Sequence, residues 1–113
     1  MRKSAVACLL TVLLGSMFGA PPALSKRKAI AVHDNYFVHR GAARSVAVER
    51  NDKVVWDWEG SNPHNVTVTR GPVRFHSRTK SSGTYTKTLT ERGTYKIICT
   101  LHAPRMRMTL KVE

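Results

Sequence analysis

The feature of this sequence that most restricts its fold is a series of short segments in which apolar and polar residues alternate. A strand with one buried face has this period of two, because successive side chains point to opposite sides. Alternating segments occur at 29–37, 45–48, 53–58, 65–69, 84–89, 94–99 and 108–112, separated by turns rich in Gly, Pro, Asn and Asp. After residue 25, no stretch has the apolar spacing of an amphipathic helix. The sequence therefore predicts an all-β sandwich of about six to eight strands, with 70–83 as a surface connection.

The first 25 residues have the organisation of a secretory signal peptide. A basic start at Arg2-Lys3 precedes an apolar run over 5–20, and small residues at Ala23-Leu24-Ser25 mark a cleavage region. A retained membrane anchor is the alternative, but Pro21-Pro22 ends the run before it reaches the usual length of about 20 apolar residues. We expect cleavage after Ser25, or alternatively after Ala23. The product is one exported domain, residues 26–113, in the periplasm or outside the cell.

Removal of this leader changes the cysteine count and the charge. Cys8 lies in the leader, so Cys99 is left without a partner for a disulfide. A lone thiol in an oxidising compartment needs burial or a metal to protect it. Two of the 19 Lys and Arg residues also leave, and the remaining 17 face 7 Asp and Glu, a formal charge of +10. This excess favours an acidic protein partner or an anionic envelope surface, and export argues against nucleic acid.

Four side chains with sulfur or imidazole donors lie at or beyond the ends of predicted strands. His64 follows one strand, Cys99 ends another, His102 comes three residues later, and Met106 follows in the same loop. Each taken singly is more often a core or surface residue. Together, a thiolate, two imidazoles and a weak axial thioether form the trigonal site that suits copper in electron transfer. We therefore predict one copper ion, cycling between Cu(II) and Cu(I).

At these residues the chain resembles the cupredoxin, or blue-copper, family, the class of plastocyanin, amicyanin and pseudoazurin. The resemblance covers nearly all of 30–113 and rests on the order and spacing of several short motifs. They are Phe37, Asp52-Lys53-Val54-Val55-Trp56, Pro63-His64-Asn65-Val66, Phe75-His76-Ser77, Gly83-Thr84-Tyr85, Gly93-Thr94-Tyr95, Cys99-Thr100-Leu101-His102 and Met106-Arg107-Met108-Thr109-Leu110.

The resemblance implies a Greek-key β-sandwich and a role for each site residue. By analogy, the equatorial copper ligands are His64, Cys99 and His102, and Met106 is the axial ligand. Asn65 matches a family position whose side chain ties the loop of the first histidine to the cysteine loop, which fixes the ligand geometry. The histidines outside this pattern are expected at the surface: His33, His39 and His76.

The last loop departs from the commonest short form of the family. That form places the methionine three residues after the second histidine and follows it with a basic residue and glycine. Here Met106 comes four residues after His102, and Met108 stands where the glycine usually does. Met106 is the preferred axial ligand, and Met108 remains an alternative.

The resulting functional expectation is a small monomeric protein that shuttles single electrons between redox partners. Four protein ligands leave no open position for a substrate, so we do not expect an enzyme. A partner with acidic surface groups would dock near His102, where Arg105 and Arg107 flank the loop. The alternative is a copper storage or delivery protein that uses the same ligands without electron transfer.

Overall fold

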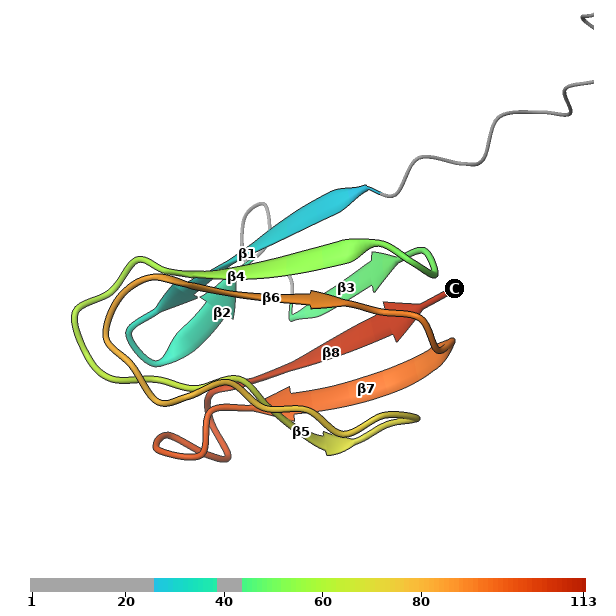
Figure 1. Ribbon diagram of the computed structural model, residues 1–113. Helices are drawn as coiled ribbons and strands as arrows, with labels where there is room; N and C mark the ends of the chain where they lie inside the picture. The colour runs from blue at the N-terminus through green and yellow to red at the C-terminus, as the bar shows by residue number, and fades with distance from the viewer. Residues whose placement is uncertain (1–25, 39–43) are drawn as a thin grey trace, which may run out of the picture.

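The computed structural model describes residues 26–38 and 44–113, and these residues form a β-sandwich of eight strands (Figure 1). The strands are β1 (Arg27–His33), β2 (Tyr36–Val38), β3 (Ser45–Val48), β4 (Lys53–Trp58), β5 (Thr67–Arg70), β6 (Thr84–Thr88), β7 (Gly93–Ile98) and β8 (Arg107–Val112). This confirms the predicted all-β sandwich and its strand number. In the described part of the chain, no helix is long and apolar enough to cross a membrane.

Each of the two sheets has four strands. One has the order β2-β1-β4-β6 and the other β3-β8-β7-β5. The pairs β1–β4 and β3–β8 are parallel, and all other neighbours are antiparallel. Because chain neighbours such as β3 and β4 lie in different sheets, the connections cross between the layers and close the core.

The core lies between the sheets and contains the apolar side chains of the alternating segments. On β4, Val54, Trp56 and Trp58 are buried, and on β8 the same holds for Met108 and Leu110. Burial of this kind contributes roughly 25 cal/mol for each Å² of apolar surface removed from water. Alternation therefore selects which face of each strand turns inward.

Two segments differ from a simple alternating pattern. Val55, expected on the outer face of β4, is 7% exposed because β4 lies between β1 and β6, where Ala29 and Thr86 are its cross-strand neighbours. Residues 70–83, predicted as a surface connection, return along β5 through an isolated bridge between Thr67 and His76.

The 70–83 segment also supplies a core residue. Phe75 is 8% exposed, and its ring centroid lies 6.1 Å from that of Trp56, 6.3 Å from Tyr85 and 6.0 Å from Tyr95. The segment pairs through single bridges instead of a continuous ladder, so only isolated positions turn inward. This is why it lacks an alternating sequence.

The connections divide between the two ends of the sandwich. At the left of Figure 1 lie the turn between β1 and β2, the connection after β4 and the loop between β7 and β8. At the right lie the β3–β4 turn, the β6–β7 turn and the C-terminus. His64, Cys99, His102 and Met106 all lie at this first end, in the connection after β4 and the loop between β7 and β8.

Candidate metal centre

Three side chains singled out by the sequence meet at this end of the sandwich. His64 lies in the connection after β4, Cys99 directly follows β7, and His102 lies in the loop before β8. The Nδ1 atoms of the two histidines are 3.2 Å apart. Cys99 Sγ lies 3.9 Å from Nδ1 of His64 and 3.6 Å from Nδ1 of His102. No other grouping of three or more His, Cys, Asp or Glu side chains in the described residues has such spacing.

These separations fit a single metal ion at the centre of the three atoms. An ion about 2.0 Å from each nitrogen and about 2.3 Å from sulfur, in a trigonal plane, places the nitrogens about 3.5 Å apart and sulfur about 3.8 Å from each. The observed values lie within a few tenths of an ångström of these. One thiolate and two imidazoles match the donor preference of copper.

His64 is held rigidly by its backbone. Its N–H donates to the carbonyl of Lys80 and its carbonyl accepts from the N–H of Lys80, both at 3.0 Å. The indole Nε1 of Trp58 also donates to the His64 carbonyl, at 3.3 Å. The side chain has no solvent exposure. The β4–β5 connection thus presents this imidazole in one fixed place.

The far side of the His64 ring contacts a carboxylate that the sequence analysis did not single out. His64 Nε2 lies 3.0 Å from Oδ1 of Asp34, in the turn between β1 and β2. A carboxylate can only accept, so Nε2 carries the proton and Nδ1 presents its lone pair toward Cys99 and His102. This is the tautomer that a metal requires.

Asp34 also accepts hydrogen bonds from the connection that carries His64. The His64 ring, the backbone N–H of Asn62 and the backbone N–H of Ser61 together hold the pKa of the Asp34 carboxyl well below its usual range. In the sequence, Asp34-Asn35 has only the signature of a turn between two strands. Nothing local indicates a contact with a residue thirty positions away.

His102 has a different environment. It is partly exposed, and the side chains of Leu101, Ala103 and Pro104 around it are exposed. Its backbone N–H donates to the Cys99 carbonyl at 3.2 Å, and its carbonyl accepts from Met106 N–H at 3.1 Å. The loop is therefore a tight turn that returns the chain to β8 while leaving this imidazole at the surface.

Cys99 and Asn65 link the two ligand loops. Cys99 is fully buried and unpaired, and its Sγ accepts the Asn65 backbone N–H at 3.5 Å. The Asn65 side chain donates to Thr100 Oγ1 at 2.7 Å and accepts the Thr100 N–H at 3.1 Å. It also donates to Thr79 Oγ1 at 3.1 Å. These bonds hold the first histidine's loop against the cysteine loop.

Both candidate methionines are buried: Met106 lies directly before β8, and Met108 is on it. The Cys99 N–H donates to the Met106 carbonyl at 3.0 Å and so extends the β7–β8 ladder by one pair. Met106 therefore lies opposite Cys99, whereas Met108 lies opposite Ile97. At about 3.4 Å per residue, Met108 is about 7 Å farther along the strand from the cysteine.

The remaining histidines take no part in this cluster. His33 Nε2 lies 3.5 Å from Glu59, and its side chain is 34% exposed. His76 is exposed. His39 and the predicted leader, residues 1–25, lie outside the described residues.

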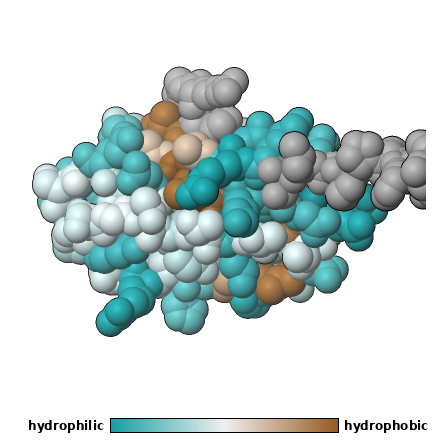
Figure 2. All heavy atoms as spheres, turned by 45° about the horizontal axis from the view of Figure 1, so that its top comes forward, coloured by the Kyte–Doolittle hydropathy of each residue, from teal (hydrophilic) through white to brown (hydrophobic). Residues whose placement is uncertain are grey.

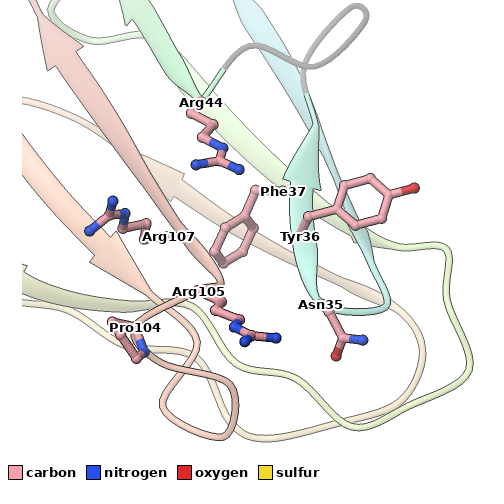
Figure 3. A pocket seen from close by; sticks show the side chains of 7 residues that line it. All are labelled: Asn35, Tyr36, Phe37, Arg44, Pro104, Arg105 and Arg107. Carbon is pink, nitrogen blue, oxygen red and sulfur yellow. The ribbon is translucent and has the colours of Figure 1, made fainter.

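Two neighbouring cavities open beside the last ligand loop. One of 340 Å³ is lined by His102, Ala103, Pro104, Arg105 and Asn35. The other, of 360 Å³, shares Pro104, Arg105 and Asn35, and adds Arg44, Arg107, Tyr36 and Phe37. Figure 3 shows the Phe37 ring in the middle, with Arg44 and Arg105 on opposite sides of it. A basic surface therefore adjoins the partly exposed imidazole.

Comparison with known proteins supports copper as the metal of this site. A family model described as copper binding proteins of the plastocyanin/azurin family matches residues 28–113. No curated protein sequence matches the chain significantly. Among solved structures, an oxidized amicyanin variant is 26% identical with a TM-score of 0.64, covering 76% of this chain and 81% of amicyanin.

Two further structures share the fold at lower identity. A purple cupredoxin from Nitrosopumilus maritimus is 21% identical, with a TM-score of 0.62, over 76% of this chain and 99% of that protein. A copper-containing nitrite reductase from Thermus scotoductus SA-01 is 19% identical, with a TM-score of 0.66, over 85% of this chain. Only 24% of the reductase is covered, so that likeness concerns one part of a larger protein.

Proposed function

Because the chain belongs to the plastocyanin/azurin family of copper-binding proteins, we propose that it transfers single electrons through a copper ion held by His64, Cys99 and His102. Copper is the cofactor, as the sequence predicted, and the resemblance to cupredoxins is confirmed. When bound, the ion supplies a Cu(II)/Cu(I) couple. Electron shuttling and the individual ligands are the proposal.

The observation that carries this proposal is the unequal exposure of the ligands. His64 and Cys99 are fully buried and hydrogen-bonded from several sides, whereas His102 reaches the surface. A buried, fixed ligand set disfavours large rearrangement when the charge of the ion changes. One exposed imidazole offers a short path for an electron to a docked partner.

A copper titration tests the proposal. Cu(II) added to the metal-free protein is expected to produce an intense visible band from thiolate-to-copper charge transfer, with one ion bound per chain. Voltammetry is expected to give a reversible couple. A colourless product contradicts the ligand assignment. A coloured product without a reversible couple supports copper storage or delivery instead.

We propose Met106 as the axial ligand, because it lies directly across the β7–β8 ladder from Cys99. Met106→Leu is expected to shift the reduction potential and the visible spectrum. Met108→Leu, two ladder positions farther from the site, serves as the matched control and is expected to change them little. The reverse result assigns the axial role to Met108.

The proposed partner is an acidic redox protein that docks at His102. Arg44, Arg105 and Arg107 surround the cavity beside this loop (Figure 3). On the face that Figure 2 shows, hydrophobic residues form separate patches within a mainly hydrophilic surface. Charge attraction between the arginines and the acidic groups of the partner favours the encounter. An anionic surface of the cell envelope is a second binding partner for these arginines.

We further propose that the protein is exported and acts as a carrier, not as an enzyme. Residues 1–25 have the composition of a signal peptide, and residues 26–113 form the copper domain. Three protein ligands and an axial methionine leave no site on the ion for a substrate. Mass spectrometry of the protein recovered outside the cytoplasm tests the export. We expect its mass to show the loss of residues 1–25.

A further inference from the structure

The two candidate histidine ligands differ in what holds their outer nitrogen. His64 Nε2 lies 3.0 Å from the Asp34 carboxylate. The polar contacts of the His102 side chain involve Nδ1, and none of the hydrogen bonds found within residues 26–38 and 44–113 involves its Nε2. The site is therefore asymmetric, with one fixed negative charge behind its buried imidazole.

Asp34 is itself oriented by the loop that carries the ligand. Its Oδ1 accepts the Asn62 N–H at 2.9 Å and the Ser61 N–H at 3.1 Å, and Oδ2 accepts the Ser61 hydroxyl at 3.3 Å. With His64, these contacts use both carboxylate oxygens. The turn between β1 and β2 and the connection after β4 are thus fastened together by one side chain.

Gly60 makes this close approach possible. A Cβ atom at position 60 would lie 2.3 Å from Asp34 Oδ1 and 2.8 Å from the Asp34 backbone nitrogen. Both separations are shorter than real contacts allow. Any side chain at position 60 would have to displace the carboxylate, so the sequence of the connection is matched to Asp34.

We propose that Asp34 is a positioning residue for copper, holding Nδ1 of His64 toward the ion and stabilising Cu(II) relative to Cu(I) through its negative charge. The inference rests on the proposed function of the site. A carboxylate behind a metal-bound imidazole fixes the ring and makes it a more basic ligand. The more positive ion gains more from both effects, so the reduction potential is lowered.

Two substitutions separate the charge from the contact. Asp34→Asn keeps an oxygen that accepts from His64 and removes the charge, so we expect a higher reduction potential with the visible band retained. Asp34→Ala removes both, so we expect a higher potential, a changed band and a loss of Cu(II) affinity of about 10- to 100-fold. Cu(I) affinity is expected to fall less in each variant.

Glu59→Gln is the matched control. Glu59 is a neighbouring carboxylate at the same end, is half exposed and faces His33 instead of His64. We expect this variant to leave the potential and both copper affinities close to those of the wild type. Equal shifts in Glu59→Gln and Asp34→Asn would overturn the proposal, because net charge alone would then explain them.

A measurement on the unaltered protein covers the case in which the Asp34 variants do not fold. Nitrogen-15 NMR of the metal-free full chain is expected to show His64 protonated at Nε2 and unprotonated at Nδ1. Protonation at Nδ1 of neutral His64 would overturn the proposal. This result does not depend on copper binding, so it is separate from any failure of the proposed electron transfer.

An independent observation concerns Asp52 at the opposite end of the sandwich. Its side chain is 2% exposed, and its oxygens accept the backbone N–H groups of Lys26 and Glu49, each at 2.9 Å. The Lys26 carbonyl also accepts the Lys53 N–H at 2.8 Å. The first described residue is therefore anchored through its backbone nitrogen.

We infer that cleavage of the proposed leader after Ser25 converts this hydrogen bond into an ion pair. Hydrolysis by a leader peptidase places hydroxyl on the Ser25 carbonyl carbon and hydrogen on the Lys26 nitrogen. The new Ser25 carboxyl then releases a proton and the Lys26 amine takes one up, becoming an α-ammonium. Asp52 then faces a positive charge instead of a neutral amide. Charged hydrogen bonds of this kind are stronger than neutral ones. Processing after Ala23 would leave the neutral amide in place.

Two measurements test this second inference. Mass spectrometry of the exported protein is expected to show Lys26 as its first residue, and Leu24 would overturn the inference. At pH 6 the processed protein is expected to have a folding constant about fivefold larger than a form with one methionine before Lys26. Asp52→Asn is expected to abolish the difference. Equal stability of the two wild-type forms would also overturn the ion pair.

Discussion

The two ends of this β-sandwich each contain an aspartate that joins segments distant in sequence, but the two residues do different work. Asp34 joins the β1–β2 turn to the ligand connection and contacts His64. Asp52 joins the start of β1 to the turn before β4 and contacts no candidate ligand. The comparison indicates that one end is organised for the metal and the other for the fold.

Burial follows the same division. At the ligand end, the buried polar side chains are those of His64, Asn65 and Ser77. Each makes a hydrogen bond to a neighbouring loop: His64 to Asp34, Asn65 to Thr100 and Ser77 to the backbone of Val66. At the opposite end, Asp52 is the buried polar residue among the described positions, beneath the left-handed Asn51 at φ 76°. Substitutions at the ligand end should therefore change the copper site, and those at the other end should change stability.

The largest expected effect is the loss of the site in Cys99→Ser. A hydroxyl is a far weaker copper ligand than a thiolate and gives no intense charge-transfer band. We expect the visible band to vanish while the far-ultraviolet circular dichroism of the sandwich is retained. Met108→Leu, which changes a buried sulfur off the proposed site, is the control. A retained band in Cys99→Ser would contradict the division between the ends.

The second prediction concerns Asp52 and acid. Burial by itself raises the pKa of Asp52, but the backbone donors of Lys26 and Glu49 and the charges of Lys26 and Lys28 outweigh it, so the pKa is lowered from 3.8. The unfolded chain therefore binds this proton first. The stabilisation is complete above pH 3.8 and is lost as the pH falls through the lower folded value.

Asp52→Asn tests that prediction. At pH 7 we expect a free energy of unfolding lower by about 2 kcal/mol, with the copper spectrum unchanged. The difference between variant and wild type should shrink below pH 3.8. Asp57→Asn is the control, since Asp57 pairs with β1 and β6 through its backbone, and its side chain makes none of the hydrogen bonds found among the described residues. An equal loss in both variants, measured by urea unfolding, would contradict the role of Asp52.

A smaller effect is expected for Gly60→Ala. The added methyl group displaces Asp34, so the potential should rise as it does for Asp34→Ala, but less. Crowding of this kind costs about 1–3 kcal/mol of stability. Ser61→Ala, which removes only the 3.3 Å hydroxyl contact, is the control. An unchanged potential in Gly60→Ala would show that the carboxylate can move without affecting His64.

The smallest effect is expected in the electron-transfer rate of Arg105→Ala. Loss of one positive charge beside His102 should lower the association rate with an acidic partner about two- to threefold at low salt. The difference should fade as ionic strength rises. Arg92→Ala removes an exposed charge from the β6–β7 turn at the other end and should have little effect. Equal slowing in both variants would indicate a general charge effect.

Much of the fold could be predicted because the alternation of apolar and polar residues within each strand shows which face is buried. Val54, Trp56 and Trp58 alternate with more polar neighbours, and this pattern follows from the division of side chains between core and water. Phe75 could not be placed in the same way. It belongs to a segment paired by single bridges, and isolated inward positions leave no period to detect.

The site shows a similar limit. Cys99 and His102 are three residues apart, so their proximity is a local property of one loop and was visible in the sequence. The sequence favoured Met106 and kept Met108 as an alternative, because the spacing of the last loop departs from the commonest family form. Both residues are buried, and their cross-strand partners differ.

The sequence by itself therefore determined the alternating strands, the donor set that suits copper, and the strong positive charge. Only the tertiary structure decided that Nδ1 of His64 lies 3.2 Å from Nδ1 of His102, and that the Asp34 carboxylate contacts Nε2 of His64. The physical reason is range. Alternation and loop spacing act over a few residues, whereas the contact between a β1–β2 turn and a ligand exists only once both sheets have packed and brought their loops to one end.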